Sequence, residues 1–216
     1  SRGLGDVYKR QAYIWVVGAM ALASVLVLRL GGLELGRFSA YHGHLFFLGA
    51  AFLLMEVHAI NRLALLFGTT WLVSAVTIAL VLGLIVVANL ITLAFPRIPY
   101  FLSYGGLAVS LAVSFWVQPG AVLGAGAAAG LAFGAVLLSP VFFAGLVFAR
   151  SFGMAQVAGP AIGANILGSV LGGWIEYSTM AVGMRALVLL AAAFYAFSLL
   201  LLLAQRGRPR LRGQLE

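Results

Sequence analysis

The sequence predicts an all-α membrane protein, a polytopic bundle of about seven transmembrane helices. Of its 216 residues, 63% are hydrophobic and 8% are charged, whereas soluble domains carry about 25% charged residues. A soluble fold of this size has too small an interior to bury so much apolar surface. Apolar runs of about 20 residues, the length that crosses a bilayer core, recur along the chain between short polar segments.

The predicted spans belong to one membrane domain, residues 12–204, which a basic tail at 205–216 follows. The spans are 12–30, 44–67, 71–95, 100–117, 121–149, 156–177 and 183–204. Pro96 and Pro99 end the third span, because proline cannot continue a helix. Pro140 lies inside the unusually long fifth span, where we expect a kink or tilt. A count of six spans, with the first apolar run outside the bilayer, is the alternative.

The first eleven residues, SRGLGDVYKRQ, differ in composition from everything that follows. They resemble a translated adapter sequence that recurs at the ends of open reading frames assembled from metagenomes and transcriptomes. We interpret residues 1–11 as a non-native leader and exclude them from fold reasoning. A genuine polar amino-terminal arm is the other interpretation. If the leader is not native, we expect the chain to be a fragment that lacks its true amino terminus.

The placement of arginine and tryptophan predicts how the bundle is oriented. With the tail in the cytoplasm, alternating spans place four arginines at inner helix ends or loops: Arg29, Arg37, Arg97 and Arg150. The outer loops then carry no Lys or Arg outside the leader, as the positive-inside rule requires. The four tryptophans fall at outer helix ends, where their rings favour the membrane interface: Trp15, Trp71, Trp116 and Trp174. The net charge of +8 is spread over the chain, which does not indicate a nucleic-acid surface.

Four polar residues interrupt the apolar second span: Glu56, His58, Asn61 and Arg62. A charged group at the centre of a transmembrane helix costs roughly 2.5–3.5 kcal/mol, so such residues indicate a functional site by default. On a helical wheel His58, Asn61 and Arg62 fall within a sector of about 100°, and Glu56 points to the opposite side. We therefore expect neighbouring helices to enclose this helix on two faces.

The expected partner of Glu56 is an arginine on another helix, and Arg185 in the seventh span is the first candidate. Glu176, at the end of the sixth span, is expected to pair with Arg62 or Arg185. Two interpretations stay open for these residues. They form either interhelical pairs that determine packing or a gate or binding site for an ion or substrate. We expect Glu56→Gln to change function or assembly more than Glu34→Gln.

Small residues in the sixth span predict close helix packing. Gly159 and Gly163 are four residues apart, as are Gly168 and Gly172, and this spacing lets helix backbones approach closely in membranes. Asn165 is expected to donate a hydrogen bond across the same contact. The alternative is a mobile helix that lines a pathway.

We expect no metal, no cofactor and no catalytic residue in this chain. It has no cysteine, and His42 and His44 are two residues apart at a helix start, where their side chains would diverge without a carboxylate beside them. Serines such as Ser110, Ser114 and Ser139 are scattered through the spans, where their hydroxyl groups usually bond to the backbone of their own helix.

Several separated motifs resemble the membrane region of large bacterial spermidine-synthase-like proteins. The motifs are GAAFLLME at 49–56, LFGTTW at 66–71, ANL at 88–90, PVFFAGLVFA at 140–149 and GANILGSVLGGWIEY at 163–177. Within and after the last motif, the features shared with the family are Asn165, Gly168, Gly172, Gly173, Glu176, Tyr177, Gly183 and Arg185.

The resemblance implies an integral membrane module in the bacterial inner membrane that serves as anchor or conduit for an upstream soluble catalytic domain. In the family that domain resembles a polyamine aminopropyltransferase. This chain contains no strand followed by a glycine-rich turn, so we expect no enzymatic activity of its own. The expected partners are the lipid bilayer and that upstream domain. A part of a major-facilitator-like transporter and a structural membrane scaffold are the alternative interpretations.

Overall fold

The structure is a computed structural model, and it describes residues 39–68, 70–117, 120, 127–176 and 183–206, together with the single residues 15, 19 and 22. The chain divides into two compact units, Ser1–Ser39 and Ala40–Glu216. The second unit contains all the helices discussed below. Every regular element among the described residues is a helix, and none is a strand.

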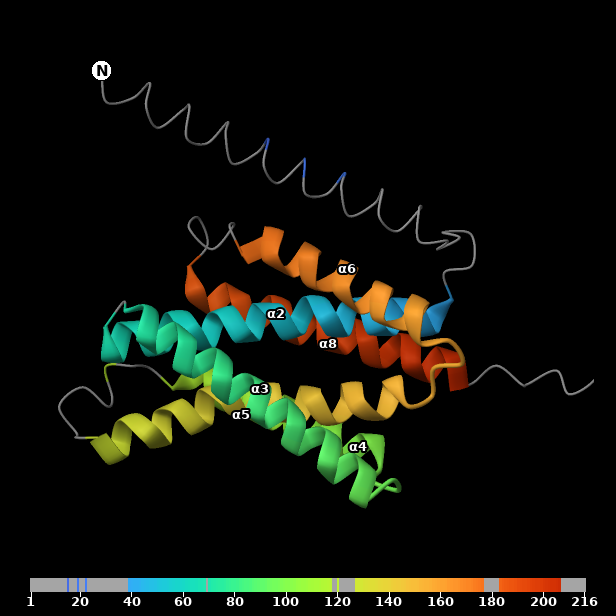
Figure 1. The fold of residues 1–216 in the computed structure, drawn as a ribbon, viewed down its shortest axis with the longest axis horizontal. Helices are drawn as coiled ribbons and strands as arrows, with labels where there is room; N and C mark the ends of the chain where they lie inside the picture. Colours follow the sequence, from blue (N-terminus) through green and yellow to red (C-terminus); the bar gives the residue numbers. More distant parts are fainter. Residues whose placement is uncertain are drawn as a thin grey trace, which may run out of the picture. The chain divides into compact units, whose positions relative to one another are not determined.

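Six helices form the described part of the second unit (Figure 1). They are α2 Ala40–Phe67, α3 Trp71–Ala94, α4 Tyr100–Trp116, α5 Ala127–Phe152, α6 Ala158–Glu176 and α8 Met184–Arg206. All except α4 are long and apolar enough to cross a membrane, which gives five candidate spans. With 17 residues, α4 is about 25 Å long, shorter than a core of about 30 Å. A multi-pass helical membrane protein is thus supported. The count of seven is not, because α4 is short and most of the predicted span 12–30 lies outside the described residues.

Several helix boundaries differ from the predictions by one to four residues, and two of these differences concern polar side chains. Helix α2 begins at Ala40 instead of residue 44, so His42 and His44 lie within its first turns. Helix α5 ends at Phe152 instead of residue 149, which places Arg150 in its last turn. Gly68, with a φ of 95°, turns the chain between α2 and α3. The Thr70 side chain then caps the first turn of α3 by accepting from the Val73 amide.

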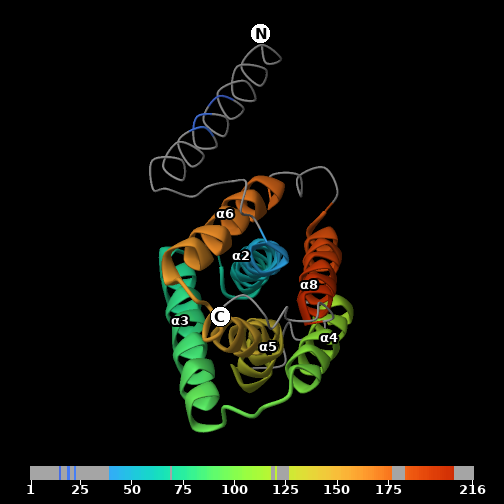
Figure 2. The same ribbon diagram turned by 90° about the vertical axis from the view of Figure 1, so that its right-hand side faces the viewer.

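Helix α2 is the centre of the unit. Figure 2 shows α6, α3, α5 and α8 arranged around it, and its most extensive contacts are with α6 and α8. Its buried residues lie on several sides of the helix, from Leu45 and Leu48 to Ala50 and Met55, as expected of a helix enclosed by others. On the side of α8, the Phe47 ring stacks on Phe197 with 5.6 Å between centroids.

Helix α3 is apolar all round and mostly exposed. Among its residues, Leu80, Leu90 and Leu93 are each at least half exposed, whereas Thr77 and Val81 are buried. A helix with an apolar exposed surface needs a lipid environment, since water would not solvate these side chains. The absence of a polar face along α3 therefore supports the membrane assignment independently of overall composition.

Helix α5 continues through Pro140, which lacks the amide proton that would bond to the Val136 carbonyl. Two serine hydroxyls take over this role. Ser139 Oγ donates to the Val136 oxygen at 2.7 Å, and Ser114 Oγ donates to it from α4 at 3.3 Å. The proline thus creates a free carbonyl that helps to join α4 and α5. The expected kink at Pro140 stays a prediction.

Helices α2 and α6 run parallel and touch through their backbones. A Cβ atom added to Gly168 would lie 2.6 Å from the Phe46 carbonyl carbon and closer still to its oxygen. A Cβ atom added to Gly172 would lie 2.5 Å from the Ala50 carbonyl oxygen. Only glycine permits these close approaches. Gly168 and Gly172 therefore lie at a tight helix contact, as their spacing predicts.

The other residues of α6 that were predicted to pack against a neighbouring helix differ in whether they contact α2. Asn165 Nδ2 donates to the Leu45 carbonyl oxygen of α2 at 3.1 Å, which is the expected bond across the contact. A Cβ atom on Gly49 of α2 would in turn collide with the Asn165 backbone. Gly163 is half-buried, whereas Gly159 is exposed, with nothing within 4 Å of an added Cβ atom. No described residue therefore packs closely against Gly159, unlike the expectation for a packing glycine.

Candidate functional site

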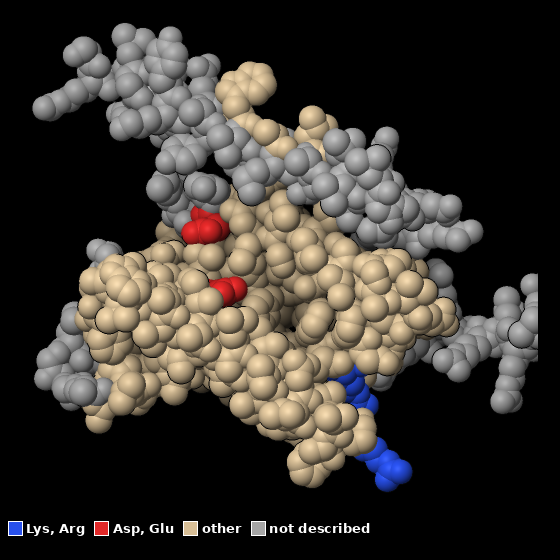
Figure 3. All heavy atoms as spheres, in the orientation of Figure 1, with Lys and Arg blue, Asp and Glu red and all other residues tan. Residues whose placement is uncertain are grey.

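The close contact between α2 and α6 brings two carboxyl groups to the same level of the bundle. An added Cβ atom on Gly173 would lie 3.2 Å from a Leu53 methyl group, so these two residues face each other across the parallel helices. Glu56 and Glu176 each follow three residues later, about 4.5 Å further along each helix. Both carboxyl side chains are half-buried. Figure 3 shows acidic groups (red) near each other on one face and basic groups (blue) at the other end.

The structure does not place Glu56 against Arg185, contrary to the prediction. Arg185 is exposed, and its guanidinium carbon lies 6.0 Å from the centre of the Phe115 ring of α4. No ion pair joins Glu56 or Glu176 to Arg62 or Arg185 within the described part of the chain. The prediction was wrong because Glu56 points away from the side of α2 that faces α8. Glu56 makes no hydrogen bond or ion pair with any other described residue.

The other polar residues of α2 lie on the side of the helix away from Glu56, as the helical wheel predicts. His58 is fully buried beside the backbone of Met184, at the start of α8, and Arg62 is 6% exposed. Arg62 also lies within electrostatic range of Arg185. Asn61 on the same helix is half-buried. The α2–α8 contact therefore holds an imidazole and a guanidinium group, with a second guanidinium nearby.

This cluster has unsatisfied donors. Neither ring nitrogen of His58 makes a hydrogen bond of good geometry to a described residue, although the Met184 backbone lies close by, and Arg62 Nε has no partner there. A buried polar group without a partner costs about 1–3 kcal/mol. Two like-charged arginines near each other add to that cost. The cluster therefore destabilises the described bundle. Its positive charge would favour a bound anion over a bound cation.

A buried polar network joins four helices at the opposite end of α2. His44 is fully buried; its Nε2 atom lies 2.8 Å from Ser151 Oγ of α5, and its Nδ1 atom 2.7 Å from Ser198 Oγ of α8. Tyr104 of α4 extends the network, with its hydroxyl 3.2 Å from Ser198 Oγ. The Tyr41 hydroxyl donates to the Ser151 carbonyl oxygen at 2.8 Å. Each partner of His44 comes from a different helix, so the imidazole couples the positions of α2, α5 and α8.

The His44 network holds helices together. It contains a histidine between two serines, and His44 and both serines are fully buried, so a substrate could not reach the serine hydroxyls in this arrangement. From the sequence, His44 was predicted only to lie at a helix start, without a functional role. One signal was available, because positions 44, 58 and 62 fall within about 40° on a helical wheel. All three residues are buried, and His44 and His58 both contact α8.

No group of three or more His, Cys, Asp or Glu side chains that could hold a metal ion occurs among the residues described. The chemistry available is therefore that of two half-buried carboxyl groups on α2 and α6, a cationic cluster between α2 and α8, and a hydrogen-bonded histidine. None of the protein-family models, curated proteins or solved structures compared with the chain matches it.

Proposed function

We propose that the chain is an integral membrane module that holds an organic cation of the polyamine class beside Glu56 and Glu176. In this proposal it serves as anchor or conduit for a soluble, spermidine-synthase-like catalytic domain upstream in the full-length protein. The supporting observation is the parallel contact of α2 and α6, which carries both carboxyl groups to the same level. The catalytic partner and the polyamine rest on the sequence resemblance alone.

Three features of Glu56 support a bound cation. The carboxyl group has no ion-pair partner among the described residues, so a carboxylate there needs a counter-charge. It is half-buried, which strengthens any electrostatic attraction relative to open water. The arginines Arg62 and Arg185 belong to the α2–α8 side, which leaves the side of Glu56 free of them.

The proposed orientation places the end of the bundle that carries Arg97 and Arg150, the basic end, in the cytoplasm of a bacterial cell. Arg97 lies in the turn between α3 and α4, and Arg150 in the last turn of α5. Helix α8 ends on the same side, next to the arginine-rich tail. The positive-inside rule then makes the tail cytoplasmic and brings Glu56 and Glu176 toward the outer leaflet.

The test is spermidine-dependent stabilisation of the purified protein in detergent. A ligand that binds only the folded state at 100 times its Kd stabilises by about 2.7 kcal/mol, which for a chain of this length raises Tm by roughly 5–10 °C. We expect a saturable rise for the wild type, none for Glu56→Gln, and the full rise for the charge-matched control Glu34→Gln. An equal rise with sodium chloride at the same ionic strength would contradict specific binding.

Counterflow of labelled spermidine in liposomes separates the roles that the module could have. Uptake that Glu56→Gln abolishes indicates a conduit, or a transporter of the major-facilitator kind. Binding without counterflow indicates an anchor that holds substrate near an enzyme. If the wild type neither binds nor moves spermidine, the polyamine proposal is refuted and a structural scaffold is the better description. A long sequencing read across the 5′ end of the source gene tests separately for the upstream domain.

A further inference from the structure

A groove made of two neighbouring cavities lies along α4 and α8, on helices that the polyamine proposal does not involve. It consists of two adjoining cavities of about 420 and 690 Å³. Both cavities are lined by Tyr104 and Leu199, so the two cavities adjoin at these residues. Each cavity by itself falls in the range of about 300–1,000 Å³ that is typical of sites that hold a small organic molecule.

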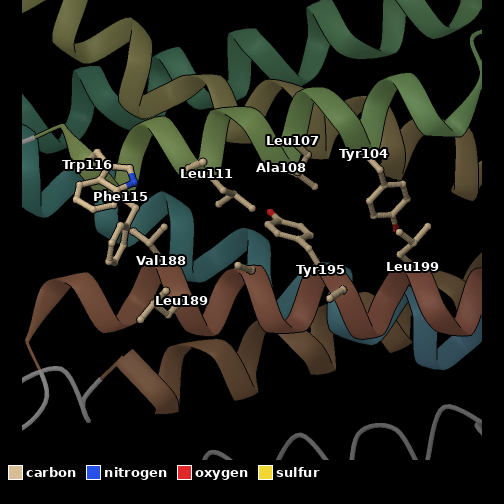
Figure 4. A pocket seen from close by; sticks show the side chains of 13 residues that line it. Tyr104, Leu107, Ala108, Leu111, Phe115, Trp116, Val188, Leu189, Tyr195 and Leu199 are labelled. Atoms are coloured by element: carbon tan, nitrogen blue, oxygen red, sulfur yellow. The ribbon is translucent and has the colours of Figure 1, made fainter.

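The first cavity is an apolar channel. Figure 4 shows it between the two helices, with Leu111, Phe115 and Trp116 on the α4 side and Val188 on the α8 side. The Tyr195 hydroxyl of α8 points from that helix toward α4. Tyr195 is only 3% exposed, and its hydroxyl has no hydrogen-bond partner among the described residues. A buried donor on a residue that lines a cavity indicates an occupant that supplies an acceptor there.

The second cavity lies at the basic end and has an uncompensated positive charge. Arg97 and Arg150 line it, and no Asp or Glu is among the described residues that do so. The Arg150 guanidinium carbon sits 4.3 Å above the Tyr100 ring centre, which orients the group. Arg150 Nη1 is buried and has no hydrogen-bond partner in the described part of the chain. Two guanidinium groups without a carboxylate fit a phosphate, which can accept several of their hydrogen bonds.

We propose that this groove binds one anionic phospholipid of the membrane. The phosphate lies at Arg97 and Arg150, one acyl chain follows the apolar cavity towards Trp116, and an ester carbonyl accepts a hydrogen bond from Tyr195. Charge and apolarity thus change along the groove in the same order as along such a lipid.

The dimensions of the groove agree with this occupant. From Tyr104 to Trp116 the apolar cavity follows twelve residues of α4, about 18 Å. One leaflet contributes about 15 Å of hydrocarbon to the bilayer core. The arginines lie just beyond Tyr104, at the basic end, where a headgroup would meet the surface. The groove is therefore long enough for the acyl chain of a lipid in one leaflet. Its two arginines lie at the end where the lipid headgroup would be.

The test measures binding of phosphatidylglycerol and phosphatidylcholine to the delipidated protein by native mass spectrometry. We expect phosphatidylglycerol to bind at least tenfold more tightly, and Arg97→Gln combined with Arg150→Gln to remove that preference. The control Arg185→Gln changes a different exposed arginine and should leave the affinity within twofold. Glycerol phosphate, which has the anionic group without acyl chains, should bind at least tenfold more weakly than phosphatidylglycerol.

A second pair of variants tests the apolar channel. Ala196 lines the cavity on α8, whereas Ala193 is exposed on the same helix and does not line it. We expect Ala196→Phe to fill the channel and weaken phosphatidylglycerol binding tenfold, and Ala193→Phe to have no effect. Equal affinities of these two variants, or equal binding of the two lipids by the wild type, would overturn the proposal.

A measurement on the wild type covers the case in which the arginine variants do not fold. Phosphatidylglycerol with a photoreactive diazirine in its acyl chain should label peptides of α4 and α8. Labels confined to α3 and α5 would refute the proposed site. The absence of labels on α4 and α8 would also refute it, and would indicate that another part of the chain or a second copy covers the groove.

Discussion

Replacement of Gly168 by alanine tests the backbone contact on which the α2–α6 pair depends. The added methyl group meets the Phe46 carbonyl, with 2.6 Å to its carbon, and lies 3.0 Å from the Ala50 amide nitrogen. All these atoms are backbone, so the collision cannot be relieved by a side-chain rotation and the two helices must separate. Overpacking of this kind costs about 1–3 kcal/mol. The separation also strains the Asn165–Leu45 hydrogen bond, which adds about 0.6 kcal/mol in a membrane protein.

The matched control is Gly159→Ala on the same helix. Nothing lies within 4 Å of an added Cβ atom there, so the substitution should be neutral or stabilise by about 0.5–1 kcal/mol through the higher helix propensity of alanine. Thermal unfolding in detergent should therefore give a Tm roughly 3–14 °C lower for Gly168→Ala than for the wild type, using about 2–4 °C per kcal/mol. If the two variants melt at the same temperature, the inferred contact between α2 and α6 is wrong.

Two further substitutions probe the polar groups of the bundle. Ser198→Ala removes a partner of buried His44 and should lower the free energy of unfolding by about 1–3 kcal/mol, measured by denaturant titration. Ser110→Ala, which loses only a bond to its own helix, should cost under about 0.5 kcal/mol, and equal losses would contradict the network. Arg185→Gln removes the like charge near Arg62 and should leave Tm unchanged or raise it. A Tm lowered by more than about 4 °C would indicate that Arg185 has a stabilising partner.

Parts of the candidate site could be predicted from the sequence because they depend on a single helix. The helical wheel places Glu56 on the opposite side of α2 from His58 and Arg62. In the structure Glu56 is half-buried, whereas His58 and Arg62 are buried. The spacing of Gly168 and Gly172 likewise indicates a close-packed surface. Gly159 has the same spacing to Gly163, yet its surroundings are open. Small residues permit close approach without specifying whether a neighbour is present.

Pairings between helices could not be predicted in the same way. Arg185 was expected to pair with Glu56 because opposite charges attract, but the direction of each side chain depends on how α8 is rotated against α2. In the structure α8 turns the Ser198 side chain towards His44 and Arg185 towards Phe115. Nothing in the sequence around Ser198, the one serine of α8, indicates which histidine it meets.

The sequence by itself determined that this is a helical, multi-pass membrane protein, because composition and the length of apolar runs depend on the solvent and not on tertiary contacts. It also determined where most helices end, through proline, glycine and polar corners. Only the tertiary structure decided that α2 is central, that His44 joins three helices, and that Tyr195 and Arg150 line one groove. Those features depend on the rotation and register of packed helices. Rotation and register come from side-chain fit summed over the whole interface, which no local sequence pattern specifies.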